Sequence, residues 1–322
     1  MKSLSQQESN ILYVIKSFAI LCVVTAHMPF GNAYPVAEIV RMSLSQIGVI
    51  IFFISSGFFY TRKKNDSRQF YKKKAKTVLI PWVIWSIFVY LVSVLITRSL
   101  SGFPLSYLKV FFGIGHVYWY LTILFICYVI FRYIYAKDEI LYICMAITIG
   151  SVLLSAFGVI KYSYLNQYLN VFNWVGFFAL GILIRRKNLL LKITKIPSFI
   201  VAFALLIIFI VLSVIRGSQI EAYIDIWSIP IELCGFISCL FFSKLFSSIK
   251  VLIDLGKKSF LIYLMHILVA GAINTRLPYN TVFFILRPFI ALAVCYIISK
   301  TLEYVMKKLK LSEYNYIFGL GR

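Results

Sequence analysis

The sequence predicts an all-α polytopic integral membrane protein with about ten transmembrane helices and no soluble domain. Hydrophobic residues make up 61% of the 322 residues and charged residues only 14%, and the mean hydropathy is +0.89. A soluble domain is about half apolar and a quarter charged. Apolar runs follow one another along the chain, and no polar segment reaches the roughly 50 residues that an independent domain needs. Residues 1–322 are therefore expected to form a single transmembrane domain.

The basic residues predict how the helices cross the membrane. Of the 33 Lys and Arg residues, 25 fall in alternate loops on one side, five in the loops on the other, and three lie in or at spans. Loops rich in Lys and Arg stay in the cytoplasm, so we expect a multi-pass plasma-membrane protein with both termini inside. This asymmetry accounts for the net charge of +22, so the charge does not indicate a protein that binds nucleic acid. Hydropathy predicts spans at about 11–30, 38–60, 77–97, 117–135, 139–158, 171–185, 197–215, 226–246, 258–275 and 282–303.

The first predicted span carries two residues that hydrocarbon does not tolerate without a reason, Lys16 and His27. They are 11 residues apart, so they lie within about 20° of each other on one helix face and roughly 16 Å apart along its axis. This face offers a cation at mid-depth and an imidazole toward the outside, a pattern typical of a functional site. The alternative is that Lys16 snorkels to an interface and His27 lies among lipid headgroups.

Small and polar residues inside later spans also have structural explanations. Gly57, in the segment FFISSGF, allows another helix to approach closely, and Ser55 or Ser56 could hydrogen-bond across helices. Glu232 is the only carboxylate that the predicted boundaries bury deeply, and a buried carboxylate is costly unless it is paired. It could belong to the site, or form a structural ion pair with Lys16, Arg41 or Arg287.

The basic segment between Arg62 and Lys76 has two interpretations. Topology, or contact with anionic lipids, explains most of its charges. Lys73 and Lys76, however, are one helical turn apart and adjoin the third span. They could therefore reach inward to a phosphate group. The span that follows contains Pro81 near its start, which could kink it.

Two further histidines lie in or near apolar spans. His116 and Trp119, in the segment GHVYWYL, are about one turn apart on the outer side. An aromatic belt at the membrane interface explains the aromatic residues of this segment but not His116. His266, in SFLIYLMH, lies roughly 12 Å into the ninth span.

These segments together resemble the membrane acyltransferase-3 family, whose polytopic members acylate cell-surface polysaccharides and peptidoglycan. The first span of that family has an arginine, ten residues and a proposed catalytic histidine, and here the same frame runs from Lys16 to His27. Lysine replaces arginine at position 16, and in this respect the motif is similar to that of the branch with the fucose and surface-polysaccharide O-acetyltransferases. All three histidines fall on motif positions. The other matching segments are FFISSGF, the two lysines before Pro81, HVYWYL from His116, and SFLIYLMH.

The resemblance implies transfer of an acyl group, expected to be acetyl, from cytoplasmic acyl-CoA to a hydroxyl of a surface polysaccharide or its lipid-linked precursor. The phosphates of the donor need cations, a role that suits Lys73 and Lys76 with Arg62 nearby. The hydroxyl needs a general base, which suits His27, although His27 could instead carry the acyl group. Candidate donors to the developing oxyanion are Lys16, Ser56 and Trp119. The remaining candidates for the catalytic site are His116, Glu232 and His266.

Other function classes find less support. A P-loop, an HExxH motif, a DxDxDG loop and a glycine-rich dinucleotide turn are all absent from the sequence, which argues against an ATPase, a metalloprotease or an oxidoreductase. The six cysteines lie in apolar spans without CxxC spacing, so we expect neither a metal nor a disulfide framework. The rival is an exporter or permease in which Lys16, Glu232 and His266 form a proton or substrate path. An acyltransferase needs His27 and acyl-CoA, whereas an exporter should not respond to removal of the acyl donor.

Overall fold

Helices account for the regular structure of the described residues. The computed structural model describes residues 4–29, 34–60, 67–100, 102–114, 117–134, 137–160, 167–193, 198–217, 224–278 and 280–320. Within these stretches no β-strand occurs, which confirms the predicted all-α class. Each predicted span overlaps one main helix: α1 (Gln6–Ala26), α2 (Pro35–Phe58), α4 (Ile80–Thr97), α6 (Trp119–Ile134), α7 (Asp138–Ala156), α8 (Val175–Arg186), α10 (Ser198–Arg216), α11 (Ser228–Leu245), α12 (Lys250–Arg276) and α13 (Thr281–Lys308). The short elements are α3 (Ser67–Lys74), η1 (Ala75–Leu79), α5 (Leu105–Phe112), η2 (Gln167–Leu169), η3 (Val171–Asn173), α9 (Leu189–Ile193) and η4 (Ser312–Phe318).

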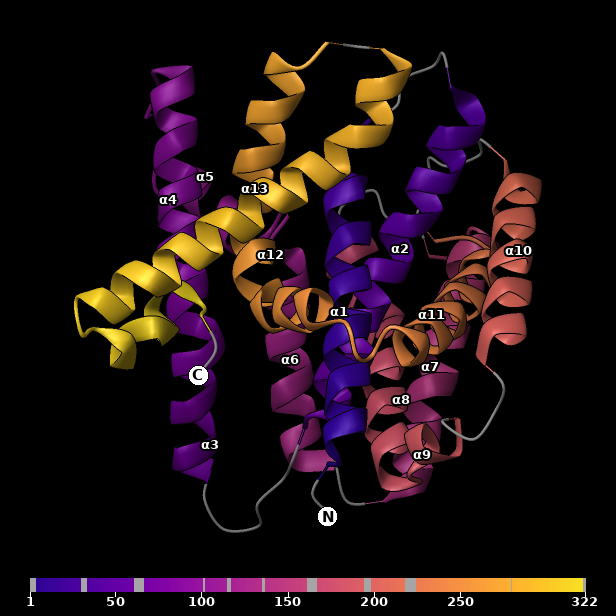
Figure 1. Cartoon of the computed structure of the whole chain (residues 1–322). Coiled ribbons are helices and arrows are strands. Elements are labelled where there is room, and N and C mark those ends of the chain that lie inside the picture. The colour runs from indigo at the N-terminus through magenta and orange to yellow at the C-terminus, as the bar shows by residue number, and fades with distance from the viewer. Residues whose placement is uncertain are drawn as a thin grey trace.

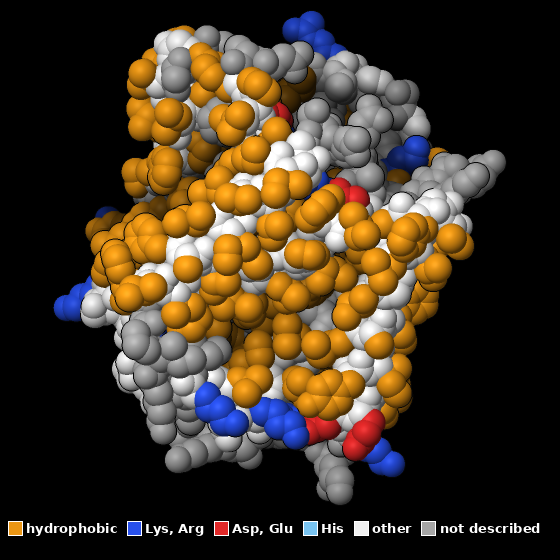
Figure 2. All heavy atoms as spheres, turned by 90° about the vertical axis from the view of Figure 1, so that its right-hand side faces the viewer, with side chains coloured by type: hydrophobic (Ala, Val, Ile, Leu, Met, Phe, Trp, Pro, Cys, Tyr) orange, Lys and Arg blue, Asp and Glu red, His pale blue; other side chains and the backbone are white. Residues whose placement is uncertain are grey.

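Several of these helices are suited to lipid. Among the described residues, seven helices are long and apolar enough to cross a membrane by length and composition, and they include α1, α2, α10 and α13. The outer face of α10 exposes large side chains, among them Ile200 at 75% and Ile207 at 59%. Figure 2 shows this side of the molecule, where hydrophobic side chains cover the middle of the face and a group of charged ones lies near its lower edge. These features confirm a polytopic membrane protein.

The first helix, α1, lies in the middle of the bundle (Figure 1), where it contacts α2, α11, α12 and α13. A capping box fixes its start, because the Ser5 hydroxyl accepts from the backbone N–H of Glu8 and the Glu8 carboxylate accepts from the backbone N–H of Ser5. Most positions that follow are apolar and buried, as in a helix enclosed on all sides. Lys16 and His27 are exceptions and are only half-buried.

Glycine brings α2 and α8 into backbone contact. A Cβ atom at Gly57 would lie 2.0 Å from the carbonyl oxygen of Phe178, and one at Gly181 would lie 1.9 Å from that of Ile54. No side chain fits in either place, so the two glycines allow the helices to approach from both sides. The prediction that Gly57 permits a close helix contact is confirmed. This contact holds the C-terminal end of α2 in place, including Ser56.

The third predicted span begins earlier than hydropathy indicated. The helix runs without a break from Arg68 to Thr97 through α3, η1 and α4, so much of the basic segment is helical. A π-helical turn, η1, lies directly before Pro81, and there the backbone N–H of Ile80 donates to the carbonyl of Ala75. Proline has no N–H for a normal helical bond, and the wider turn accommodates this. Lys72, Lys73 and Lys74 of α3 and Lys76 of η1 therefore lie on the helix that leads into this span.

Candidate active site

A cavity of about 930 Å³ lies among α1, α2, α3, η1, α6, α12 and the C-terminal residues. Its most distinctive property is charge, because six lysines line it and no Asp or Glu occurs among the described residues that do so. The six are Lys16, Lys72, Lys73, Lys74, Lys76 and Lys257. A cleft lined by one sign of charge concentrates ligands of the opposite sign. This cavity is therefore suited to a molecule that carries several phosphate groups.

Two of these lysines, Lys74 and Lys76, lie against aromatic rings rather than against carboxylates. The Nζ atom of Lys74 lies 3.5 Å from the ring centroid of Tyr128, and that of Lys76 lies 5.1 Å from the ring centroid of Tyr316. Within the described part of the chain, none of the six lysines forms an ion pair. A cation on an aromatic face keeps its full charge, so these ammonium groups can still bind an anion.

Close packing of α1 and α12 places two more lysines in the same wall. A Cβ atom at Gly256 would lie 1.8 Å from the carbonyl oxygen of Tyr13, so only glycine allows this approach. The ring of Tyr13 then lies between two cations, with the Nζ of Lys16 at 5.8 Å and that of Lys257 at 5.4 Å from its centroid. The sequence gives no local sign that Lys257 belongs with Lys16, because 241 residues separate them.

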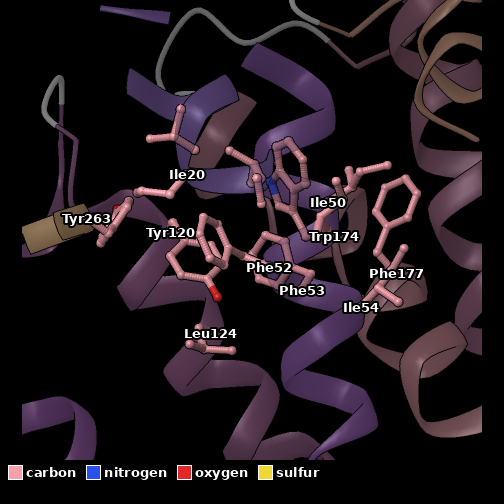
Figure 3. Close-up of a cluster of buried hydrophobic side chains, with 14 of the residues drawn as sticks. Ile20, Ile50, Phe52, Phe53, Ile54, Tyr120, Leu124, Trp174, Phe177 and Tyr263 are labelled. Atoms are coloured by element: carbon pink, nitrogen blue, oxygen red, sulfur yellow. The ribbon is translucent and has the colours of Figure 1, made fainter. Parts of the chain in front are cut away.

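Aromatic side chains form the inner end of the cavity. Phe52, Tyr120 and Tyr263 lie in the buried cluster of Figure 3, with the rings of the two tyrosines 5.4 Å apart. The hydroxyls of Tyr120 and Ser56 share a hydrogen bond of 3.3 Å, and the hydroxyl of Tyr263 donates to the carbonyl of Val117 at 2.5 Å. Ser56 thus faces the cavity, as a candidate site residue should, and Tyr263 joins α12 to the start of α6.

Beyond Tyr263 lies a pair of histidines. The rings of His27 and His266 are 5.0 Å apart, and the ring of His266 is 5.5 Å from that of Tyr263. The Nδ1 atom of His266 lies 2.5 Å from the backbone carbonyl oxygen of Tyr263. A carbonyl oxygen only accepts, so Nδ1 carries the proton and Nε2 is left as an acceptor. Nε2 is buried without a hydrogen-bond partner among the described residues.

The position of His27 is fixed through its backbone. His27 is the C-cap of α1, one residue beyond the last helical residue, and its carbonyl oxygen accepts a hydrogen bond of 2.9 Å from Nδ2 of Asn274. Asn274 lies on α12, two turns beyond His266, so one helix contacts His27 at two points. Asn274 could not be predicted from the sequence, since a single amide in an apolar helix gives no signal of its own.

The structure brings most of the predicted site residues together in two adjoining groups. Lys16, Ser56, Lys73 and Lys76 line the cavity, and His27 and His266 form the pair beyond Tyr263. It does not bring Trp119 to either group, because that ring packs between Trp174 and Tyr168, with centroids 4.9 and 5.1 Å away. Arg62 and His116 lie outside the described residues.

Glu232 lies buried in α11 and is not among the residues that line the cavity. The cations expected to pair with it have other contacts. Arg41 pairs with Glu38, the Nη2 of Arg287 donates to the carbonyl of Leu277 at 2.6 Å, and Lys16 faces the cavity. In the described part of the chain, the predicted ion pair of Glu232 with one of these three does not form.

Comparison with protein families gives a match. The model of a family described as an acyltransferase domain, acyltransferase-3, matches residues 10–300. A search of curated proteins and a search of solved structures each found no match. The matched range contains the lysines of α3 and η1 and both histidines of the pair, and it ends before η4.

Proposed function

Because this chain belongs to the acyltransferase-3 family, we propose that it transfers an acyl group, acetyl in the first instance, from cytoplasmic acyl-CoA to a hydroxyl of a surface polysaccharide or its lipid-linked precursor. Family membership makes the chain an acyltransferase, and its apolar helices make it a membrane protein. The observation that carries the finer proposal is the cavity with six lysines. Coenzyme A carries a diphosphate and a 3′-phosphate, and a basic cavity of this kind is suited to both.

The donor would bind at the end of the bundle where α1 begins and α2 ends. Lys73 and Lys76 lie on the α3–η1 side of the cavity and Lys257 on the α12 side, so phosphates between them could be bound from both sides. By the positive-inside rule this end faces the cytoplasm, where acyl-CoA is available. In this arrangement both chain termini are cytoplasmic and the protein is a multi-pass component of the plasma membrane.

Lys16 takes a different role in this proposal from the one that its motif suggests. It lies on the same helix as His27 but roughly 16 Å away along the axis, and it lines the cavity with the other lysines. A group at that distance cannot stabilise an oxyanion that forms beside His27. We therefore assign Lys16 to binding of the donor, and propose that the pantetheine arm extends past Tyr263 toward the histidine pair.

The histidine pair would carry out the chemistry. A sugar hydroxyl attacks the carbonyl carbon of the thioester, a C–O bond forms, and the C–S bond breaks. His27 accepts the proton of the hydroxyl and then gives it to the thiolate of coenzyme A, so the enzyme returns to its starting state. The alternative is that His27 attacks first, releases the thiol and holds the acyl group on its imidazole until the sugar accepts it.

The proposal is tested by measuring ester groups on the surface glycan. A strain that lacks the protein should lose these esters, and the wild-type chain should restore them while a His27→Ala chain of equal abundance should not. Purified protein in lipid vesicles should transfer radiolabelled acetyl from acetyl-CoA to the extracted glycan. Unchanged ester content in the deletion strain, together with no transfer in vesicles, would rule the proposal out.

A further inference from the structure

The C-terminal residues of the chain fold back onto the lysine cavity. After α13 the chain turns into η4, and three residues of this part, Tyr316, Gly319 and Leu320, are among those that line the cavity. The family match ends at residue 300, so this wall of the cavity comes from outside the matched range. The match therefore gives no information about what the wall does.

Specific contacts hold this segment in place. The indole Nε1 of Trp85, on α4, donates a hydrogen bond of 3.2 Å to the carbonyl of Phe318. Gly319 has a φ of +83°, which favours glycine. A Cβ atom there would lie 3.0 Å from a side-chain atom of Leu264 and 3.2 Å from one of Phe260, both on α12. The segment is thus attached to α12, which lines the cavity, and to α4, which continues the cavity-lining turn η1.

Tyr316 combines an aromatic face with neighbouring positive charge. Its ring is half-buried at the cavity, and the Nζ of Lys76 lies 5.1 Å from the ring centroid. An adenine nucleotide has matching parts, a flat aromatic base and phosphates attached to its ribose. Bases stack on aromatic side chains, and lysines bind phosphate. The next wall of the cavity, on α3 and η1, carries four lysines, Lys72, Lys73, Lys74 and Lys76.

We infer that the segment from Ser312 to Leu320 is the nucleoside-binding wall of the donor site, with the ring of Tyr316 stacked on the adenine of coenzyme A. This inference rests on the proposed function, because it takes coenzyme A as the carrier of the acyl group. It assigns recognition of the base to a segment outside the family match, and recognition of the phosphates to the lysines within it. The thioester end of the donor does not contact this wall.

Binding of two probes to the purified full-length protein tests the inference. The probes are coenzyme A and 4′-phosphopantetheine, which has the arm and one phosphate but no adenosine. Stacking on an aromatic ring contributes enough that Tyr316→Ala should weaken coenzyme A binding about tenfold. Binding of 4′-phosphopantetheine should not change. Tyr316→Phe keeps the ring and should bind both probes as the wild type does, whereas Tyr316→Leu keeps the bulk without the ring and should behave like Tyr316→Ala.

The same segment provides a matched control. Tyr314 is 42% exposed and is not among the residues that line the cavity, so Tyr314→Ala should leave both affinities unchanged. If Tyr316→Ala does not fold, Tyr316→Leu and Tyr316→Phe still give the comparison with and without a ring.

The possible outcomes separate the inference from the proposed function. If the wild-type protein does not bind coenzyme A, the proposed function and the inference both fail. If it binds coenzyme A, and Tyr316→Leu binds it equally well, only the inference fails. If Tyr316→Leu loses affinity for both probes to the same extent, the ring supports the cavity as a whole and the assignment to adenine is wrong.

Discussion

Replacement of Lys73 and Lys76 by glutamine removes two of the six positive charges that line the cavity. A charge-assisted hydrogen bond contributes about 1.5–3 kcal/mol, and about 1.4 kcal/mol is a factor of ten in affinity. Two contacts with no compensation would therefore weaken donor binding by roughly a hundredfold or more. Four lysines remain, and they can take over part of the interaction with the phosphates. We accordingly expect the donor KM, and the Kd of coenzyme A, to rise by more than tenfold.

The assay compares acetyl-CoA and acceptor kinetics of the double variant with those of the wild type in lipid vesicles. The acceptor KM should change little, because the sugar does not contact these lysines. Lys250→Gln is the control, since Lys250 is an exposed residue of α12 outside the cavity. The difference between double variant and wild type should shrink at high salt. A donor KM equal to that of the wild type would show that the two lysines are only topology signals.

Three further predictions concern orientation, packing and the position of His27. A cysteine introduced at Asn65 should escape a membrane-impermeant thiol reagent in intact cells, while one at Asn32 should react; labelling at Asn65 would reverse the assigned orientation. Gly57→Ala places a Cβ atom 2.0 Å from the carbonyl oxygen of Phe178. The free energy of unfolding in detergent should therefore fall by roughly 1–3 kcal/mol, as is typical of overpacking, and an unchanged Tm would refute this close contact. Asn274→Ala removes the hydrogen bond to the His27 carbonyl, so kcat should fall about tenfold at unchanged coenzyme A affinity; an unchanged kcat would mean that Asn274 does not position His27.

The parts of the site that lie within one helix could be predicted from the sequence. The one-turn spacing of Lys73 and Lys76 placed them together beside the third span, and both line the cavity. His27, by contrast, lies one residue beyond α1 and outside the cavity that Lys16 lines. Helical periodicity is a local property, so the relative positions of residues on one helix can be predicted from the sequence. Gly57 could be read in the same way, since a glycine inside an apolar helix marks a position where another backbone approaches.

Relations between distant helices could not be predicted. The pairing of His27 with His266 and Asn274 depends on α12 packing against α1, and no local pattern specifies which two helices of a bundle meet. Charge pattern was also ambiguous. Lys72 and Lys74 looked like topology signals, because lysines in a cytoplasmic loop and lysines that line a cavity have the same composition. Only the unbroken helix Arg68–Thr97 and its π turn place them in the cavity.

In the proposed function, His27 performs the acyl transfer on a thioester that reaches it from the lysine cavity. The most direct test is the rate of acetyl transfer from acetyl-CoA to glycan by purified His27→Ala in lipid vesicles. The contact of His27 with Asn274 uses only the backbone carbonyl, so the variant should insert and fold. We predict that the rate is lower than that of the wild type by a factor of at least roughly 10²–10⁴, and that the affinity for coenzyme A is unchanged. Transfer by well-folded His27→Ala at close to the wild-type rate would contradict the account.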